Sequence, residues 1–367
     1  MDQVQNYKCP GCGAPLVYNG ATQSLHCSSC GNDYSVETVQ LMDEAMGQAQ
    51  AGSKFNWADY TPRQFEPAEA QSLATYSCPS CGAQITGDDS MGSTVCPYCG
   101  NSTIVKGTFE GSFKPDFVIP FEIEKDKAVK LFEADAMKKP FIPDEFKDKK
   151  RLQEMTGVYV PFWTFDCNCS ALITYNAQNV RTWRDSEYEY TQTDYYRLLR
   201  SGGISYMNIP VDASLKADDA YMDALEPFDY SKAVDFNTGY ISGYLADKYD
   251  VSVEDSVERA NKRVENSTTE IFKDTTKGYG LVIPEFTNVQ TAQGIVRYSL
   301  LPVWMLNIKY GGKNYNYAVN GQTGKVVGEY PIDERKKKKH FRKTLLKYFI
   351  PSAAVCVAAV LLLSNYF

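Results

Sequence analysis

The sequence predicts a multidomain α+β protein, and three observations lead to this fold class. Eight of the eleven cysteines form four Cys-x-x-Cys pairs before residue 100. The middle of the chain alternates aromatic and β-branched segments with amphipathic helical ones. The last 23 residues, Leu345–Phe367, carry a single charged side chain, Lys347. We therefore expect two small cysteine modules, a mixed α+β domain with an antiparallel sheet, and one C-terminal transmembrane helix.

The expected domains follow one another along the chain. At 367 residues it is long enough for a full hydrophobic core beside smaller modules. The cysteine modules cover 1–36 and 76–106, and 37–75 forms a helix and linker between them. The α+β domain covers 107–332, followed by a basic segment over 333–344 and the transmembrane helix over 345–367.

The two cysteine modules are copies of one unit. Tyr7-Lys-Cys-Pro-Gly-Cys-Gly-Ala recurs 69 residues later as Tyr76-Ser-Cys-Pro-Ser-Cys-Gly-Ala, and Cys27-Ser-Ser-Cys-Gly-Asn recurs as Cys96-Pro-Tyr-Cys-Gly-Asn. A Cys-x-x-Cys turn presents two sulfurs from one knuckle, and a second knuckle across a hairpin completes the tetrahedron that structural zinc requires. A glycine after each pair permits the tight turn. The motif predicts two structural zinc ions, one held by each of two sets of ligands: Cys9, Cys12, Cys27 and Cys30, and Cys78, Cys81, Cys96 and Cys99.

Disulfides or redox-active dithiols are the alternative interpretation of these pairs. Met1–Cys9 is polar and lacks the apolar region of a signal peptide, which favours a reducing compartment and hence metal. His26 precedes Cys27, but its counterpart in the second copy is Val95, so we expect it to pack or face solvent. Cys167 and Cys169 lie one residue apart in an expected strand, which favours buried thiols.

The α+β domain is predicted from its strands and helices. Turn residues at Asn320-Gly321 and Thr323-Gly324 indicate a hairpin between the last two strands. We expect helices in this domain over Lys125–Met137 and from Ser252 onward. Before the domain, between the cysteine modules, we expect a helix over Ser35–Gln50 and a linker docked at a few points over Ala51–Leu73. The expected strands are Val158–Tyr175, Gly280–Pro284, Ser299–Tyr310, Tyr315–Val319 and Lys325–Tyr330.

The C-terminal segment predicts a single membrane span. Twenty-three residues at about 1.5 Å per residue can cross a hydrocarbon core of roughly 30 Å, and Ala353–Leu363 is apolar on every side. The basic residues before it are expected to stay cytoplasmic and to contact anionic lipid. This predicts a single-pass protein of the cell membrane, with its N-terminal bulk in the cytoplasm. The alternatives are an amphipathic or core helix, and a nuclear-import or nucleic-acid patch for the basic run.

The charge distribution argues against nucleic acid as a partner. The net charge is −7, but the chain from Arg335 onward holds eight Lys and Arg and no acid. Without those eight, 30 basic residues face 45 acidic ones, a net charge of −15. Affinity for nucleic acid depends on Lys and Arg that neutralise phosphates, so an acidic body is a poor footprint.

These features resemble a known family. The Cys-Pro-x-Cys-Gly knuckles look like the TFIIB-type zinc ribbon, and the overall plan is similar to the TFIIB-type zinc ribbon-containing membrane proteins of mostly Gram-positive bacteria. Supporting segments are Tyr159-Val-Pro-Phe-Trp, Leu301-Pro-Val-Trp and Tyr317–Pro331. Such proteins are often labelled primosomal or helicase-like, although no Gly-x-x-x-x-Gly-Lys-Ser/Thr loop occurs. The resemblance implies an association with SPFH-domain and phage-shock-type membrane proteins.

We therefore expect a membrane-anchored zinc-ribbon protein that acts as a protein-binding scaffold or adaptor in envelope-stress assemblies. A nucleic-acid-binding ribbon protein linked to transcription or replication is one alternative, and an enzyme of unrecognised class is another. Four cysteines leave zinc no open position for catalysis, and the chain holds two histidines and no nucleophile elbow. We therefore expect no enzymatic activity and identify no small-molecule substrate.

Overall fold

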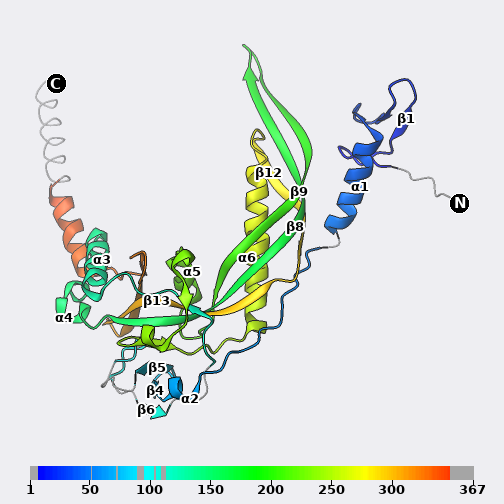
Figure 1. The fold of residues 1–367 in the computed structure, drawn as a ribbon. Coiled ribbons are helices and arrows are strands. Elements are labelled where there is room, and N and C mark those ends of the chain that lie inside the picture. Colours follow the sequence, from blue (N-terminus) through cyan, green and yellow to red (C-terminus); the bar gives the residue numbers. More distant parts are fainter. Residues whose placement is uncertain are drawn as a thin grey trace, which may run out of the picture. The chain divides into compact units, whose positions relative to one another are not determined.

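The structure, a computed structural model, describes residues 7–50, 52–71, 73–88, 95–102, 105–108 and 113–347. The chain folds into two compact units, each assembled from three separate stretches (Figure 1). The first unit is Met1–Thr61, Trp163–Val211 and Ser252–Arg297. The second is Pro62–Phe162, Asp212–Val251 and Tyr298–Phe367. Each cysteine module thus lies in a different unit, and the predicted span of the α+β domain contributes to both.

The core of the first unit is built on three long strands and the helix that packs on them. Strand β8 (Thr156–Arg184) lies between β9 (Glu189–Asp212) and the antiparallel β12 (Leu281–Thr291). Alternate residues of β8 are buried with residues of α6 (Val253–Asp274) in one cluster, as the two-residue period of a strand requires. The Tyr175 hydroxyl donates to the Thr269 carbonyl at 3.0 Å, which ties the helix to the sheet.

The first part of the expected linker, up to Thr61, lies in this unit and contacts it at a few points. Lys54 and Trp57 form isolated parallel bridges with Gln290 and Gly294. The indole Nε1 of Trp57 donates to Asn261 Oδ1 of α6 at 2.8 Å. The preceding helix α1 (Val36–Gln50) contacts β12 and begins where expected, because Ser35 Oγ accepts a hydrogen bond from the Thr38 amide at 3.1 Å.

The second unit contains a mixed sheet. Its strands run in the order β10-β7-β13-β8-β11-β5-β4-β6, with β14 and β15 following from β13. β11 pairs parallel to β8, and β7 parallel to β13, so the sheet is mixed where the sequence predicted an antiparallel one. The strands are β4 (Leu73–Ser77), β5 (Gln84–Asp88), β6 (Val105–Thr108), β7 (Phe117–Val118), β10 (Val234–Asp235), β11 (Leu245–Asp247), β13 (Ile295–Tyr310), β14 (Lys313–Asn320) and β15 (Val326–Gly328).

Short helices complete the second unit and confirm its α+β class. The ring of Phe132, on α3 (Lys125–Lys138), packs edge-on against Tyr317 of β14, with centroids 4.9 Å apart. The turn between β14 and β15 forms the expected hairpin, in which Val319 pairs with Val326. The helices are α2 (Pro67–Ala70), α3 (Lys125–Lys138), α4 (Lys149–Leu152) and α5 (Asp219–Leu225), with 3₁₀ turns over Asp144–Lys147, Tyr230–Lys232 and Thr238–Ile241.

The prediction of a membrane-spanning helix is corrected by the described C-terminal segment. Residues 334–347 are helical, exposed along most of their length and rich in Lys and Arg. Lys336 pairs with Asp144 at 2.6 Å, so this helix begins against the second unit. No helix within the described ranges is both long and apolar enough to cross a bilayer. The expected transmembrane helix and cell-membrane localisation are therefore not upheld, and residues 348–367 of that span lie outside the described residues.

Candidate metal centres

The structure brings each predicted set of four cysteines together. Within each set, the sulfur atoms all lie within 4.8 Å of one another. Tetrahedral zinc with bonds of about 2.3 Å would hold its sulfurs roughly 3.8 Å apart, whereas a disulfide bond is about 2.05 Å long. Four Sγ–Sγ separations lie close to the zinc value and far from that of a disulfide, and each group could hold one zinc ion. They are Cys12–Cys27 at 3.4 Å, and Cys9–Cys30, Cys78–Cys99 and Cys81–Cys96 at 3.6 Å.

All four knuckles share one backbone turn. In each, the carbonyl of the first cysteine accepts a hydrogen bond of 2.8 or 2.9 Å from the amide of the glycine that follows the second cysteine. That glycine has a φ between 67° and 76°, a region in which a Cβ atom is strained. The turn therefore requires the glycines that the repeat conserves between its two copies: Gly13, Gly31, Gly82 and Gly100.

Backbone amides favour the thiolate form of one buried cysteine in each module, whereas burial raises the pKa of the buried Cys96. The Cys30 amide lowers the pKa of Cys27 to about 6. Burial raises the pKa of Cys78, but the amides of Cys81 and Ser80 outweigh it and lower the value to about 7. The thiolate is the form that binds a metal, so Cys27 and Cys78 are the cysteines whose surroundings favour metal binding.

The other residues considered from the sequence lie outside the two sets. His26 ends the short strand β2 (Ser24–His26) and its Nδ1 lies 3.0 Å from Asp33 Oδ1 at the surface. Cys167 and Cys169 are buried on the face of β8 that meets α6, as expected. Burial raises the pKa of Cys167 to about 12, which makes it a poor ligand or nucleophile.

The first cysteine module is an exposed three-stranded ribbon. Strands β1 (Val17–Asn19), β2 and β3 (Asp33–Tyr34) lie in that order, and β1 is exposed throughout. Of its four cysteines, two are buried and two, Cys12 and Cys30, are exposed. A cavity of about 440 Å³ separates the first knuckle from α1, and Met42 and Met46 line it with Arg197.

The second cysteine module is part of the sheet of its unit. Its strands β4, β5 and β6 belong to that sheet, and Ile85 of β5 pairs with Asp247 of β11. Cys78 and Cys96 are buried in the main hydrophobic cluster, against which Cys81 and Cys99 also pack. The sequence did not single out Tyr98 or Asp247. Tyr98 lies between the two cysteines of its knuckle in the sequence. Its hydroxyl donates to Asp247 Oδ2 at 2.5 Å.

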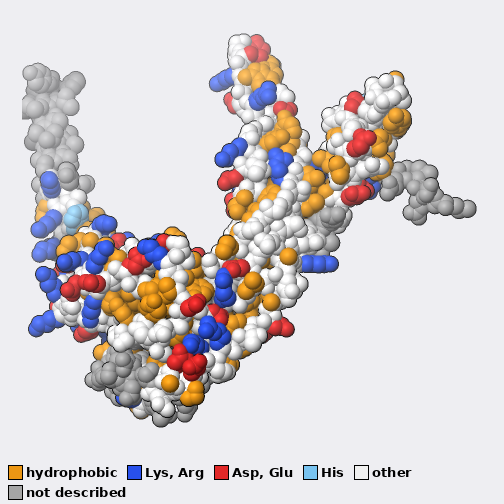
Figure 2. Space-filling model, viewed as in Figure 1, with side chains coloured by type: hydrophobic (Ala, Val, Ile, Leu, Met, Phe, Trp, Pro, Cys, Tyr) orange, Lys and Arg blue, Asp and Glu red, His pale blue; other side chains and the backbone are white. Residues whose placement is uncertain are grey.

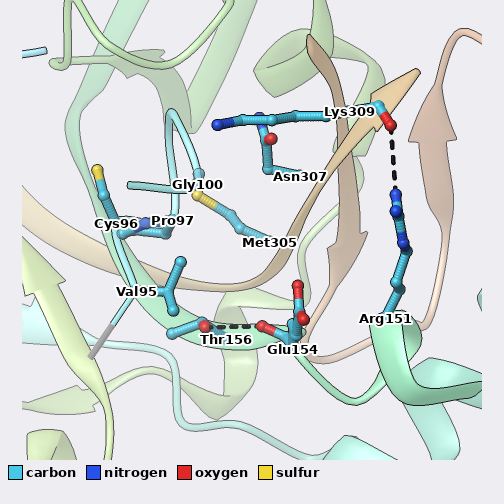
Figure 3. Close-up of a pocket in the computed structure, with 10 residues that line it drawn as sticks. All are labelled: Val95, Cys96, Pro97, Gly100, Arg151, Glu154, Thr156, Met305, Asn307 and Lys309. Carbon is cyan, nitrogen blue, oxygen red and sulfur yellow. Dashed lines mark hydrogen bonds between the residues drawn. The ribbon is translucent and has the colours of Figure 1, made fainter. Parts of the chain in front are cut away.

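A pocket of about 260 Å³ opens beside this second module (Figure 3). The knuckle from Val95 to Gly100 forms one side, and β13 contributes Asn307 and Lys309. Arg151 lies at the edge of the pocket and donates to the Lys309 carbonyl at 3.2 Å, as Figure 3 shows. Its charged groups are the half-buried Arg151, the exposed Lys309 and the carboxylate of Glu154, and this mixture selects no particular ligand.

Comparison with known proteins gives one informative match. Over 333 residues the chain is 34% identical to "Uncharacterized protein YdjG" of Bacillus subtilis (strain 168), an alignment that covers 91% of this chain and 92% of the relative. No protein-family model matches the chain, and no solved structure matches it. The likeness to TFIIB-type ribbons therefore rests on the knuckle sequences alone.

Proposed function

The chain belongs to the same family as YdjG of Bacillus subtilis, and we propose that this member is a zinc-ribbon adaptor that binds a protein partner. The two four-cysteine groups support the zinc part of this proposal. Four thiolates complete the coordination of zinc, so the proposal includes no catalytic role for the metal. The TFIIB-type character of the ribbons is part of the proposal and is supported by their Cys-Pro-x-Cys-Gly sequence.

An exposed aromatic hairpin is the observation that carries the protein-binding role. Beyond Gln178, the last β8 residue paired with β12, strands β8 and β9 continue as a hairpin past the end of α6 (Figure 1). Every residue from Val180 to Gln192 is exposed. Figure 2 shows hydrophobic side chains along this hairpin among charged ones. Its exposed aromatic residues are Trp183, Tyr188, Tyr190, Tyr195 and Tyr196.

The composition of the hairpin favours a protein over nucleic acid. Trp and Tyr are enriched in the buried centres of protein interfaces, where a large ring gains area with little loss of side-chain freedom. Trp183 stacks on Tyr190 with ring centroids 5.6 Å apart, so part of the surface is already ordered. Residues 180–196 carry two arginines against four acids, which disfavours contact with phosphates.

Site-specific photocrosslinking tests this role. A benzophenone amino acid at Tyr195, which is 78% exposed, is expected to capture one discrete protein from an extract of the native cells. The double change Trp183→Ser and Tyr190→Ser is expected to abolish that product while leaving the thermal unfolding of the protein unchanged, because both rings are exposed.

Met207 supplies the matched control. It is 75% exposed on the same strand β9 but lies outside the aromatic hairpin end, so a benzophenone there should give no product that depends on Trp183. Equal capture from both positions would contradict a specific surface. Salt-sensitive recovery of DNA or RNA by the wild-type chain, lost in the double variant, would favour the nucleic-acid alternative instead.

A further inference from the structure

We propose that the first ribbon is a thiol-reactive zinc site that releases its metal to peroxide-type oxidants, whereas the second ribbon retains its zinc under the same conditions. The inference rests on the zinc-binding part of the proposed function and is independent of the aromatic hairpin. The two modules have the same knuckles and ligand spacing. Their reactivity therefore differs because of what surrounds the sulfur atoms.

The first ribbon presents one thiolate of each knuckle to solvent. Cys12 and Cys30 are exposed, while Cys9 and Cys27 are buried beneath them at 1% and 0% exposure. Each exposed sulfur lies beside a buried one, with Cys12 3.4 Å from Cys27 and Cys30 3.6 Å from Cys9. An oxidant can therefore reach a sulfur that has a second thiolate within disulfide-forming distance after a small movement.

The second ribbon protects the equivalent sulfurs with the core of its unit. Cys81 and Cys99 take the places of Cys12 and Cys30, but both are half-buried. They pack against a cluster that includes Val158, Leu245 and Tyr98. Packed side chains cover part of each of these sulfurs, and the strands of this module are held by pairing within the sheet. Oxidation here is therefore slower, because fuller access to the sulfurs needs local opening of the unit.

The reaction is a two-electron oxidation of a pair of zinc thiolates. The Cys12 thiolate attacks hydrogen peroxide, forming an S–O bond and breaking the O–O bond, and hydroxide leaves. The Cys27 thiolate then attacks the Cys12 sulfur of this sulfenic acid, the S–S bond forms, and a second hydroxide leaves. Two thiolates are oxidised by two electrons and one peroxide is reduced to two hydroxides. Zinc loses two of its four ligands and dissociates.

The test measures zinc release and cysteine chemistry on the same sample. The purified full-length chain, loaded with two zinc ions, is treated with hydrogen peroxide in the presence of a chromogenic zinc chelator. One zinc ion per chain should appear at least about tenfold faster than the second, because exposure of the thiolate controls oxidation. Mass spectrometry after alkylation should find the early disulfide as Cys12–Cys27 or Cys9–Cys30, with all four cysteines of the second ribbon still reduced.

A variant of a buried thiol serves as the control, and two different negative results have different meanings. Cys167→Ser changes a buried thiol outside both sites, so the fast release should persist in that variant. Equal release of both zinc ions, or first oxidation in the second ribbon, would overturn the proposal. A purified chain that binds no zinc would instead remove the zinc-ribbon premise, so the two failures can be told apart.

Discussion

At the scale of single residues, Asp247 is the least expected feature of the second unit. It lies at the end of β11 and is only 4% exposed. The hydroxyls of Tyr98 and Ser214 both donate to its Oδ2, at 2.5 and 2.6 Å. Burial nevertheless raises the pKa of Asp247 to about 6, because the low-dielectric surroundings penalise the carboxylate more than two donors stabilise it.

This shift predicts a pH dependence of stability. Because the folded pKa lies above the unfolded value of 3.8, ionisation costs the folded state more, and the free energy of unfolding falls as pH rises from about 4 to 6. Between pH 5 and 7 the free energy of unfolding of the wild-type chain should fall by about 1 kcal/mol through this group. Asp247→Asn removes the titrating group and should lose that slope.

Urea unfolding of both proteins at several pH values measures the effect. The zinc content at each pH is the control, because acid also protonates cysteine ligands. If the two proteins show parallel stability profiles between pH 5 and 7, Asp247 does not titrate in this range and the prediction is wrong.

Two glycines of the first unit should respond in opposite directions to the same substitution. Gly13 has a φ of 76°, Gly47 lies inside α1, and no atom lies within 4 Å of a Cβ added at either position. Gly13→Ala should therefore destabilise the ribbon by about 1–2 kcal/mol through its backbone alone. Gly47→Ala should stabilise the helix by roughly 0.5–1 kcal/mol. Thermal unfolding and competitive zinc titration compare them, and a loss of stability in both would contradict this account.

Single residues also show which parts of the two metal centres could be predicted from the sequence. Spacing and duplication predicted all eight cysteines, because a four-thiolate site depends on two local turns and the hairpin between them. The contact between Tyr98 and Asp247 joins residues 149 positions apart and depends on the pairing of β5 with β11. No local pattern encodes such a pairing, although an aspartate after Leu245 and Ala246 in a strand-like run is a signal that could have been used.

At the scale of elements, the β8–β9 hairpin shows what local patterns miss. The sequence predicted a strand over Val158–Tyr175, whereas β8 continues to Arg184, and no strand was predicted where β9 lies. Past Asn179 both faces of β8 meet solvent, so the alternation that signals a strand disappears. β9 also contains Gly202 and Gly203, which lower strand propensity. β9 is extended because it pairs with β8, so its conformation depends on tertiary structure and not on its own local sequence.

Shortening this hairpin should separate binding from stability. The Asp185 amide donates to the Tyr188 carbonyl at 3.0 Å, so the chain turns between these two residues and the strands pair on either side of them. Replacing residues 181–192 with Asn-Gly should leave the free energy of unfolding within about 0.5 kcal/mol, because the removed residues are exposed. The same variant should lose the Tyr195 photocrosslink.

The comparison uses chemical unfolding and the crosslinking assay on one preparation. The matched change is Met207→Ser, which removes an equally exposed side chain from β9 without altering the aromatic end. If the shortened chain unfolds at much lower denaturant concentration, the hairpin end supports the fold and its exposure has another cause.

At the scale of the whole molecule, the chain passes back and forth between its two units. The first 61 residues belong to one unit and the next 101 to the other, and four further crossings follow. Sequence patterns divide a chain into consecutive segments, so the boundary expected at residue 106 separates the second ribbon from the sheet that contains it. The sequence gives no sign that the ribbon and the sheet are continuous, because Tyr76 and Ile85 have the composition of a small ribbon's own core. Only the pairing of β5 with β11 shows that they belong to the core of the second unit.

Removing residues 1–106 therefore tests whether the modules are separable. The deletion strips β4, β5 and the first half of β6 from the sheet and exposes the face that held Val158 and Leu245. It also removes Trp57, whose ring packs on Phe165 with centroids 5.0 Å apart in the first unit. Residues 107–367 alone should lack a cooperative thermal transition and should bind a hydrophobic dye, because each unit has lost part of its core.

Reconstitution distinguishes this from a trivial failure to express. When residues 1–106 are supplied as a separate, co-expressed fragment with zinc, the lost strands and the Trp57 segment can pair again through non-covalent contacts. The complex should then recover a cooperative transition, whereas a fragment mutated at Cys78 and Cys96 should not restore it. If residues 107–367 alone unfold in a sharp thermal transition, the ribbons are independent modules. The sequence-based division into consecutive domains would then be correct.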